Sequence, residues 1–334
     1  MTIPSRMQAV QARSAGGPEV LELVEQAVPE PAPDEVLIRV QAAGVNRADV
    51  LQRQGKYPVR TGGNPVLGLE IAGEIVRLGT EVTGWSAGAR VCTLTDGGGY
   101  GEYAVAPAVQ LLRWPKDYDA LLAAALPESC FTVWANLFQA GRLAAGETAL
   151  IHGARGGVGT MAMQLACAFG ARVIASSGSE AGCRDCLRLG ATQAINYHNE
   201  NFAVAIKKLT DGRGVDVILD PIGAANFADN LAALATEGRL VIIGFTGGHL
   251  AERADLLPIL ARRLIVTGSA MRPRSAAEKG AIGVELLEHV WPLLDQGQCK
   301  PPLARAFPLR EVAEAHRLME TGGYLGKIVL RIAA

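Results

Sequence analysis

The pattern of hydrophobic and polar positions divides the chain into two regions. Between residue 7 and about residue 120, short apolar and β-branched runs alternate with clusters of glycine and proline. This punctuation predicts many short strands and a compact, barrel-like β domain. The predicted strands of this region are 7–12, 36–42, 66–78, 90–94 and 101–106.

From about Leu122 onward, apolar strand-like runs alternate with helical stretches, which predicts βα units and a parallel sheet. After Met271, a long helix near 276–294 and a closing strand at 327–332 are expected to return to the first domain. The predicted strands of the parallel sheet are 148–152, 172–176, 194–197, 215–220, 239–244 and 264–268. The predicted domains are 1–125 with 270–334, and 126–269.

One segment combines a strand, a glycine-rich turn and a helix. The apolar run 148–152 leads into Gly153-Ala154-Arg155-Gly156-Gly157-Val158-Gly159, and apolar residues then recur at helical spacing up to Gly170. Gly156 and Gly159 would let the backbone approach a pyrophosphate, whose charge then lies at the positive end of the helix. Because a strand precedes the turn and a helix follows it, a dinucleotide-binding unit is favoured over a merely structural turn.

The end of the second strand in this domain indicates which nucleotide binds. Sites for NAD normally carry Asp or Glu there, which bonds the ribose 2′-hydroxyl. This chain has Ser176-Ser177-Gly178-Ser179 instead. Small hydroxyl residues leave room and donors for a 2′-phosphate, so NADPH is favoured over NADH. The nearest acid, Glu180, is expected to begin the next helix, where its charge matches the helix dipole.

Composition is consistent with a two-domain enzyme. The chain has 334 residues, more than the roughly 250–300 at which single cores stop growing, and 49% of them are hydrophobic. The net charge of −1 disfavours nucleic acid as a partner. No window of 18 apolar residues lacks charge, and residues 1–7 contain no apolar signal core, so we expect a cytoplasmic protein with no membrane partner. Cys183 and Cys186 have no second pair and fall in a predicted helix, which favours two neighbouring thiols over a zinc or redox site.

Several segments together resemble one known family. The chain is similar to the zinc-free quinone oxidoreductase (zeta-crystallin-like) group of the medium-chain dehydrogenase/reductase superfamily, and most of all to its p53-inducible quinone oxidoreductase branch. The segments that carry the resemblance are 46–49 (NRAD), 52–57 (QRQGKY), 67–73 (LGLEIAG), 127–132 (PESCFT), 152–159 (HGARGGVG), 196–197 (NY) and 326–330 (GKIVL). The resemblance implies an α/β protein with a GroES-like β-barrel catalytic domain and a Rossmann doubly wound parallel-sheet domain. It also implies NADPH in the cleft between them, and a homodimer.

The resemblance also bears on metal binding. Zinc-binding relatives place a cysteine at the position of Asn46, a histidine at that of Leu69 and a third ligand at that of Glu128. Asn and Leu supply neither thiolate nor imidazole, and Glu70 with Glu128 makes a poor tetrahedral set. No metal is therefore expected.

The resemblance implies roles for individual residues. Asn46 and Tyr57 match substrate-side positions at which a side chain bonds a quinone oxygen, and Thr132 matches the residue beside the nicotinamide. From the residues alone, Asn46 would be a loop side chain and Tyr57 a rim residue. The positions that match cofactor contacts are Gly156, Gly157, Val158 and Gly159 at the pyrophosphate, Ser177, Arg184 and Tyr197 at the 2′-phosphate, and Gly244, Phe245, Thr246, Ser269 and Met271 around the nicotinamide ribose.

One position departs from the family pattern. Relatives often carry a lysine where this chain has Gly182, and Arg184 is expected either to reach the phosphate or to stay a solvated helix residue. A lysine introduced at position 182 is expected to tighten NADPH binding, provided that the backbone there does not require glycine.

The predicted function is NADPH-dependent reduction of quinones by hydride transfer without zinc. The alternatives are an NADPH-dependent reductase of activated C=C bonds in enones or enoyl thioesters, and an NADPH-binding sensor or structural protein with little turnover.

Overall fold

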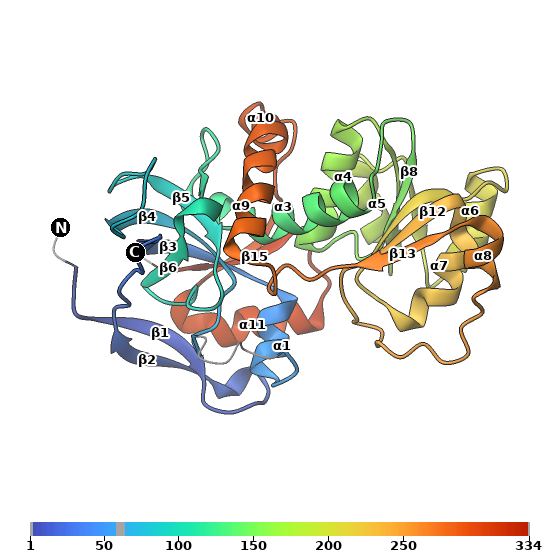
Figure 1. Ribbon diagram of the computed structural model, residues 1–334. Coiled ribbons are helices and arrows are strands. Elements are labelled where there is room, and N and C mark those ends of the chain that lie inside the picture. The colour runs from blue at the N-terminus through green and yellow to red at the C-terminus, as the bar shows by residue number, and fades with distance from the viewer. Residues whose placement is uncertain (1–2, 58–63, 333–334) are drawn as a thin grey trace. The chain divides into compact units, whose positions relative to one another are not determined.

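The chain forms two compact units, shown in Figure 1, which is a computed structural model describing residues 3–57 and 64–332. The first unit consists of Met1–Glu128, Arg274–Asp295 and Pro301–Ala334, and the second of Ser129–Pro273 and Gln296–Lys300. Most of the C-terminal part of the chain returns to the first unit, but residues 270–273 and 296–300, which the sequence analysis placed there, belong to the second.

A seven-stranded sheet forms the body of the first unit, with neighbours in the order β14-β15-β3-β4-β5-β7 and with β6 paired to β3. A separate two-stranded sheet joins β1 and β2. The strands are β1 (Arg6–Ala12), β2 (Leu21–Ala27), β3 (Glu35–Val45), β4 (Glu70–Leu78), β5 (Arg90–Leu94), β6 (Tyr103–Pro107), β7 (Leu112–Arg113), β14 (Leu303–Pro308) and β15 (Lys327–Arg331). The sequence did not predict β2, because this strand pairs only with β1 and carries Glu22 and Glu25 on its exposed positions.

The helices of the first unit pack on the apolar residues of these strands. Val36, Ile38 and Val40 of β3 belong to a buried cluster that also contains Val312 and Ala315. The helices are α1 (Arg47–Arg53), α2 (Ala120–Ala123), α9 (Ala276–Glu285), α10 (Trp291–Asp295) and α11 (Val312–Thr321), and the π-helical turn Leu286–Val290 links α9 to α10. The long helix predicted at 276–294 is therefore one helical stretch with a π-helical turn inside it.

The second unit is a six-stranded parallel sheet in the order β10-β9-β8-β11-β12-β13, with helices packed along it. Its strands are β8 (Thr148–Ile151), β9 (Arg172–Ser177), β10 (Gln193–Asn196), β11 (Val215–Asp220), β12 (Leu234–Ile242) and β13 (Ile265–Gly268). Its helices are α3 (Pro127–Val133), which begins at the boundary, α4 (Gly157–Ala168), α5 (Glu180–Arg188), α6 (Phe202–Leu209), α7 (Phe227–Ala233) and α8 (Leu257–Arg262). The strand order reverses between β8 and β11, which confirms the predicted Rossmann architecture and marks the carboxyl ends of these strands as the ligand-binding position.

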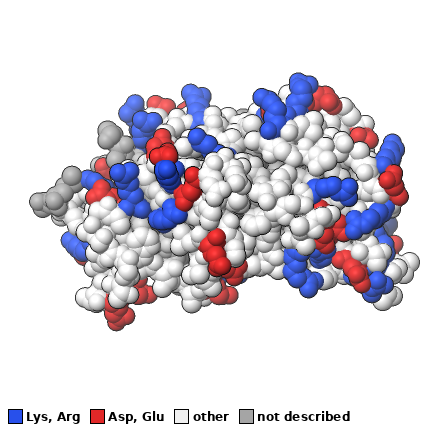
Figure 2. Space-filling model, turned by 90° about the horizontal axis from the view of Figure 1, so that it is seen from above, with Lys and Arg blue, Asp and Glu red and all other residues white. Residues whose placement is uncertain are grey.

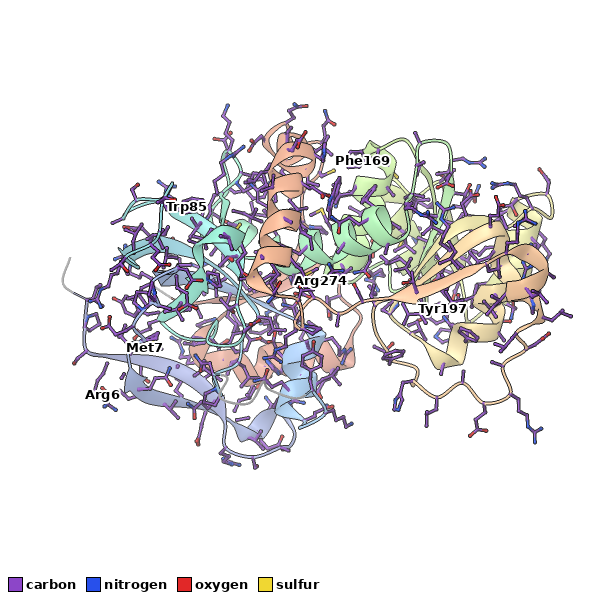
Figure 3. The ribbon with its side chains drawn as sticks, in the orientation of Figure 1. Arg6, Met7, Trp85, Phe169, Tyr197 and Arg274 are labelled. Atoms are coloured by element: carbon purple, nitrogen blue, oxygen red, sulfur yellow. The ribbon has the colours of Figure 1, made fainter. Side chains whose placement is uncertain are left out.

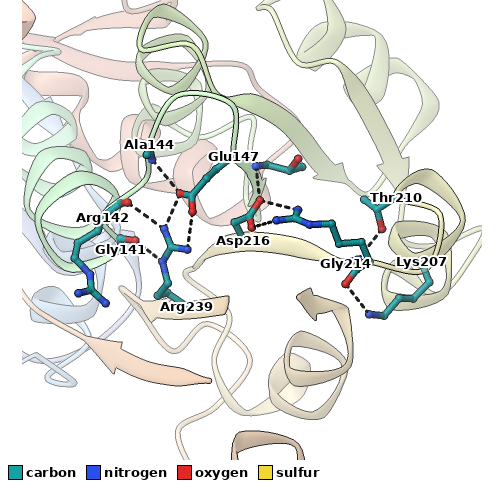
Figure 4. Close-up of polar contacts among 11 residues, drawn as sticks. Gly141, Arg142, Ala144, Glu147, Lys207, Thr210, Gly214, Asp216 and Arg239 are labelled. Atoms are coloured by element: carbon teal, nitrogen blue, oxygen red, sulfur yellow. Dashed lines mark hydrogen bonds and ion pairs between the residues drawn. The ribbon is translucent and has the colours of Figure 1, made fainter. Parts of the chain in front are cut away.

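Ion pairs and hydrogen bonds connect the strands at the amino ends of β8 and β11, opposite the ligand-binding edge (Figure 4). Arg239 donates to both carboxylate oxygens of Glu147, at 2.9 and 2.7 Å, and also to the carbonyl oxygen of Gly141. Asp216 accepts from the backbone N–H of Thr148 at 2.8 Å. Because Glu147, Thr148 and Asp216 lie at the amino ends of β8 and β11, these contacts are structural and leave the carboxyl ends open to a ligand.

Two observations concern the membrane and nucleic-acid predictions. In the described residues one helical stretch, Ala120–Ala140, is long and apolar enough to cross a membrane, but 78% of its apolar window is buried, as in a core helix. On the face drawn in Figure 2, basic and acidic side chains are interspersed rather than segregated. This face shows no basic stripe of the kind that binds nucleic acid.

Candidate functional site

The glycine turn of the second unit leads directly into α4. Gly156 precedes the helix in an extended conformation, and a Cβ added at Gly159 would overlap the carbonyl oxygen of Gly153 and lie 2.7 Å from Ala154 Cα. Glycine at 159 therefore allows α4 to start close against the turn. The first N–H groups of a helix have no intrahelical acceptor, so this end of α4 fits an anion such as a pyrophosphate.

A chain of side-chain hydrogen bonds joins the carboxyl ends of three strands in the second unit. His152 contacts Ser176 through Nδ1 at 2.7 Å and Asn230 Oδ1 through Nε2 at 2.9 Å, and Asn230 Nδ2 donates to Asp220 at 2.9 Å. Because the amide oxygen of Asn230 only accepts, His152 donates from Nε2 and accepts the Ser176 hydroxyl proton at Nδ1. Burial lowers the pKa of His152, which is consistent with a neutral ring. His152 thus positions the strand ends.

The loop after β12 is fixed to the loop after β11. Thr246 donates to the carbonyl oxygen of Pro221 from its backbone N–H at 3.1 Å and from its hydroxyl at 3.0 Å. Gly244 is partly buried and Phe245 is exposed in the same loop. The three residues predicted to surround the ribose therefore lie together at the carboxyl ends of adjacent strands.

A buried asparagine joins two other predicted positions. Asn136 Nδ2 donates to the carbonyl oxygen of Thr132 at 2.9 Å, and its Oδ1 accepts from the Ser269 hydroxyl at 3.0 Å. Asn136 lies in the π-helical segment Trp134–Ala140, a geometry frequent at functional sites. The sequence pattern did not single out Asn136, because a π-helical turn leaves no clear signal in apolar periodicity. Met271, which follows Ser269 by two residues, is buried.

The end of β9 meets the first turn of α5 at Ser177 and Gly182. Ser179 caps α5 by accepting from the backbone N–H of Gly182 at 3.1 Å. A Cβ added at Gly182 would overlap Ser177 Oγ and lie 2.7 Å from Arg155 Cδ. The expectation that a lysine at position 182 would tighten NADPH binding stays a prediction, and a side chain there requires Ser177 and Arg155 to shift.

The remaining residues near the end of β9 differ in how exposed they are and in which partners they contact. Tyr197, labelled in Figure 3, follows β10 and is half-exposed, and its hydroxyl oxygen would lie 2.7 Å from a Cβ at Gly178. Glu180 is the first residue of α5, as predicted, and its carboxylate accepts from Asn196 at 2.9 Å. Arg184 is exposed on α5 and makes no hydrogen bond or ion pair within the described part of the chain.

In the first unit, Asn46 lies between the end of β3 and α1 and is held by two buried charges. Its Nδ2 donates to Glu70 Oε1 at 2.8 Å, while Lys327 Nζ donates to its Oδ1 at 2.8 Å and also to Glu70 Oε1. Glu70 and Lys327 have side-chain exposures of 0% and 3%. A Cβ at Gly44 would overlap Glu70 Oε1, so glycine at that position makes room for the carboxylate. An amide has two N–H donors, so Asn46 keeps one for a ligand.

A second buried polar group, formed by Asp49 and its partners, binds the backbone of Asn46. Asp49 accepts from the backbone N–H of Asn46 at 2.8 Å, from that of Gly68 at 3.2 Å and from the Tyr100 hydroxyl at 3.1 Å. Burial raises the pKa of Asp49 to about 7, and burial lowers the pKa of His316, which lies beside Tyr100, to about 3. Nothing in the sequence pattern pointed to Tyr100 or His316.

Glu70 and Leu69, near the positions of the zinc ligands in relatives, are engaged in other ways. Glu70 accepts from Asn46 and Lys327 through Oε1, and from the Glu128 backbone N–H through Oε2 at 2.8 Å. Leu69 is buried, and the described residues contain no cluster of three or more His, Cys, Asp or Glu side chains arranged to hold a metal. Tyr57 is half-buried and stands immediately before residues 58–63, which lie outside the described part of the chain.

A GroES-like unit followed by a Rossmann unit with a glycine turn defines a class of two-domain, nucleotide-dependent dehydrogenases and reductases. Residues 32–116 match the alcohol dehydrogenase GroES-like domain, and residues 157–284 match the zinc-binding dehydrogenase family. Human quinone oxidoreductase is 32% identical over 331 residues, covering 97% of each chain.

Solved structures of other proteins share this two-domain fold. The structure of an NAD-dependent alcohol dehydrogenase superimposes with a TM-score of 0.85 at 32% identity, covering 98% of this chain and 100% of that one. Mycobacterial Rv1454c complexed with NADPH gives a TM-score of 0.86 at 28% identity, with the same coverage.

The chain belongs to the medium-chain dehydrogenase/reductase superfamily and is quinone oxidoreductase-like. It is therefore an oxidoreductase of a superfamily in which binding of a nicotinamide cofactor is typical. Its predicted place in the p53-inducible branch stays a prediction.

Proposed function

We propose that this protein is an NADPH:quinone oxidoreductase that works without zinc. The observation that carries the proposal is the buried Lys327–Asn46–Glu70 group, in which an ammonium bonds Asn46, at a position where zinc-binding relatives carry a ligand, and the neighbouring carboxylate of Glu70. Similarity to human quinone oxidoreductase along 97% of the chain supports the choice of substrate class.

Asn46 is suited to hydrogen-bond a substrate oxygen. Lys327 donates to its amide oxygen, which polarises the amide and strengthens its remaining N–H as a donor. A donor held in advance at this position stabilises negative charge that develops on a quinone oxygen. We assign Tyr57 as a second donor, on the resemblance.

The second unit is suited to hold the dinucleotide. The close approach at Gly159 lets α4 begin directly against the turn, so that its first N–H groups can face a phosphate group. We assign Gly156, Gly157, Val158 and Gly159 to the pyrophosphate, and Gly244, Phe245, Thr246, Thr132, Ser269 and Met271 to the nicotinamide end. When bound, the reduced nicotinamide supplies a hydride. An electron-poor quinone accepts hydride readily, so positioning and hydrogen bonding replace a Lewis acid.

Zinc independence is supported by the chemistry of Glu70. Both of its oxygens already accept hydrogen bonds, and a positive Lys327 lies against one of them, so a metal ion would meet charge repulsion and occupied lone pairs. Elemental analysis of the purified protein should find no stoichiometric zinc, and a chelator should leave activity intact. About one zinc per chain would contradict this part of the proposal.

The central experiment compares steady-state rates of NADPH oxidation with 1,2-naphthoquinone and with a panel of enones and enoyl thioesters. We expect kcat/KM to be highest with the quinone. A higher value with an enone or thioester would assign the protein to the C=C reductases. Tight NADPH binding with no turnover of any acceptor would indicate a sensor or structural protein.

A variant and a matched control test the role of Asn46. Asn46→Ala should lower kcat/KM with the quinone roughly ten- to a hundredfold, the usual effect of removing one oriented donor, and leave NADPH affinity unchanged. Asn201→Ala is the control, because Asn201 also stands at a helix start, where it caps α6 and donates to Asp229. Equal rates in the two variants would contradict the assignment.

We also propose that the protein acts as a homodimer. β13 lies at the edge of the parallel sheet, and Ile265 and Val266 are exposed on it, as are Leu257 and Leu260 of α8. An exposed apolar edge strand favours pairing with a second copy. Light scattering after size-exclusion chromatography should give the mass of a dimer, and Val266→Lys should shift it toward the monomer. The cytoplasmic location stays a prediction.

A further inference from the structure

Arg155 belongs to the glycine turn, but its side chain lies against the start of α5. Its Cδ would be 2.7 Å from a Cβ added at Gly182. Its guanidinium pairs with Asp185 of α5 at 3.1 Å, and the two side chains are 24% and 13% exposed. The arginine therefore crosses from the turn after β8 to the helix after β9. It fills the space that a larger residue at position 182 would take.

Ser177 provides an independent sign of a ligand at the same place. The residue is 5% exposed, yet its hydroxyl makes no hydrogen bond within the described part of the chain. Its Oγ points to the backbone of Gly182, since a Cβ there would overlap it. The hydrogen-bonding capacity of this hydroxyl is therefore available to a ligand. Arg155 Cδ and Ser177 Oγ thus both lie next to the Cβ position of Gly182.

The nearby acidic side chains, Asp185 and Glu180, have partners other than Arg155. Asp185 also pairs with Arg188, so its charge is shared between two arginines. Glu180 is engaged by Asn196 and Asn199, each at 2.9 Å. Arg155 therefore remains a positively charged donor at the end of β9, where the second ribose of a dinucleotide lies in Rossmann sheets.

We propose that Arg155 recognises the 2′-phosphate of NADPH together with Ser177, and so sets the nucleotide preference of this chain. The inference rests on the proposed nucleotide-binding function. A guanidinium binds phosphate through two parallel hydrogen bonds, which suits a terminal phosphate group. The cation comes from the glycine turn rather than from α5, which explains how position 182 can be glycine in an NADPH-dependent protein.

The test measures dissociation constants by calorimetry at fixed ionic strength for NADPH, NADH, adenosine 2′,5′-bisphosphate and 5′-AMP. Wild type should prefer each ligand that carries the 2′-phosphate. Arg155→Ala should weaken NADPH and the bisphosphate roughly ten- to a hundredfold, the effect of losing a charge-assisted contact. NADH and 5′-AMP should change less than about twofold. Arg155→Lys should recover part of the loss because it keeps the charge.

Arg188→Ala is the matched control, since it removes the other arginine that pairs with Asp185 and should leave all four constants unchanged. Thermal unfolding without nucleotide shows whether Arg155→Ala folds like wild type. Equal weakening of NADPH and NADH, or no change in either, would overturn the role of Arg155. Those outcomes leave the quinone reductase proposal standing if wild type still turns over quinone, whereas failure of wild type to bind either nucleotide would overturn both.

Discussion

Removing the positive charge of Lys327 should destabilise the first unit strongly. Lys327→Met leaves the Glu70 carboxylate buried with only the amide of Asn46 and the backbone N–H of Glu128 as partners. Breaking a buried ion pair from one side costs about 3–5 kcal/mol, because the remaining charge is desolvated without compensation. Glu70→Gln in the wild-type background should also be costly, since it leaves the ammonium buried.

The double variant distinguishes an ion pair from general disruption. Lys327→Met combined with Glu70→Gln removes both charges, so its free energy of unfolding should lie well above the value obtained by adding the two single effects. We expect a coupling of at least about 2 kcal/mol, within the range for residues in one polar network. Arg6→Met is the control, because the Arg6–Glu25 pair at 3.1 Å is 56% and 55% exposed and should contribute little.

The assay follows urea unfolding by tryptophan fluorescence. Three of the four tryptophans lie in the first unit and Trp134 lies in the second, so a Trp134→Phe background makes the signal specific for the first unit. This separation matters because a chain of two units need not unfold in one step. Additive effects of the two substitutions would refute the reasoning, as would a loss below about 1 kcal/mol in Lys327→Met.

Three further predictions follow from the geometry. Gly159→Val should abolish binding of NADPH and NADH alike in calorimetry, because its side chain would overlap the Gly153 carbonyl; retained affinity would contradict the close approach. Gly182→Lys should weaken rather than tighten NADPH binding, since the new side chain would meet a serine hydroxyl and an arginine stem; tighter binding would show that the backbone adapts. Because the pKa of His316 falls to about 3, the unfolded state binds one more proton than the folded state between pH about 3 and pH about 6.5. The free energy of unfolding of wild type, relative to that of His316→Asn, should thus rise by about 1.4 kcal/mol per pH unit in that window. The pKa of Asp49 is raised to about 7, which has the opposite effect on stability, but both proteins contain Asp49 and the comparison cancels it. A difference in urea midpoints between the two proteins that does not change with pH would contradict this prediction.

The sequence by itself determined the strands of the parallel sheet and the class of fold. Apolar periodicity is local, so strands such as Arg90–Leu94 and Val215–Asp220 were predicted at their observed bounds. The glycine turn before α4 was also readable, because strand, turn and helix are contiguous in the chain. Strand β12 begins at Leu234, earlier than predicted, since its first residues include Glu237 and Gly238 and interrupt the apolar run.

Only the tertiary structure decided which distant side chains share a site. Asn46, Glu70 and Lys327 come from three separate strand ends, and no spacing in the sequence relates them. The space beside Gly182 is limited by Arg155, a residue 27 positions earlier, so a substitution that looked favourable in sequence requires that side chain to move. Periodicity reports which face of an element is buried, whereas the partner across that face depends on how the elements pack.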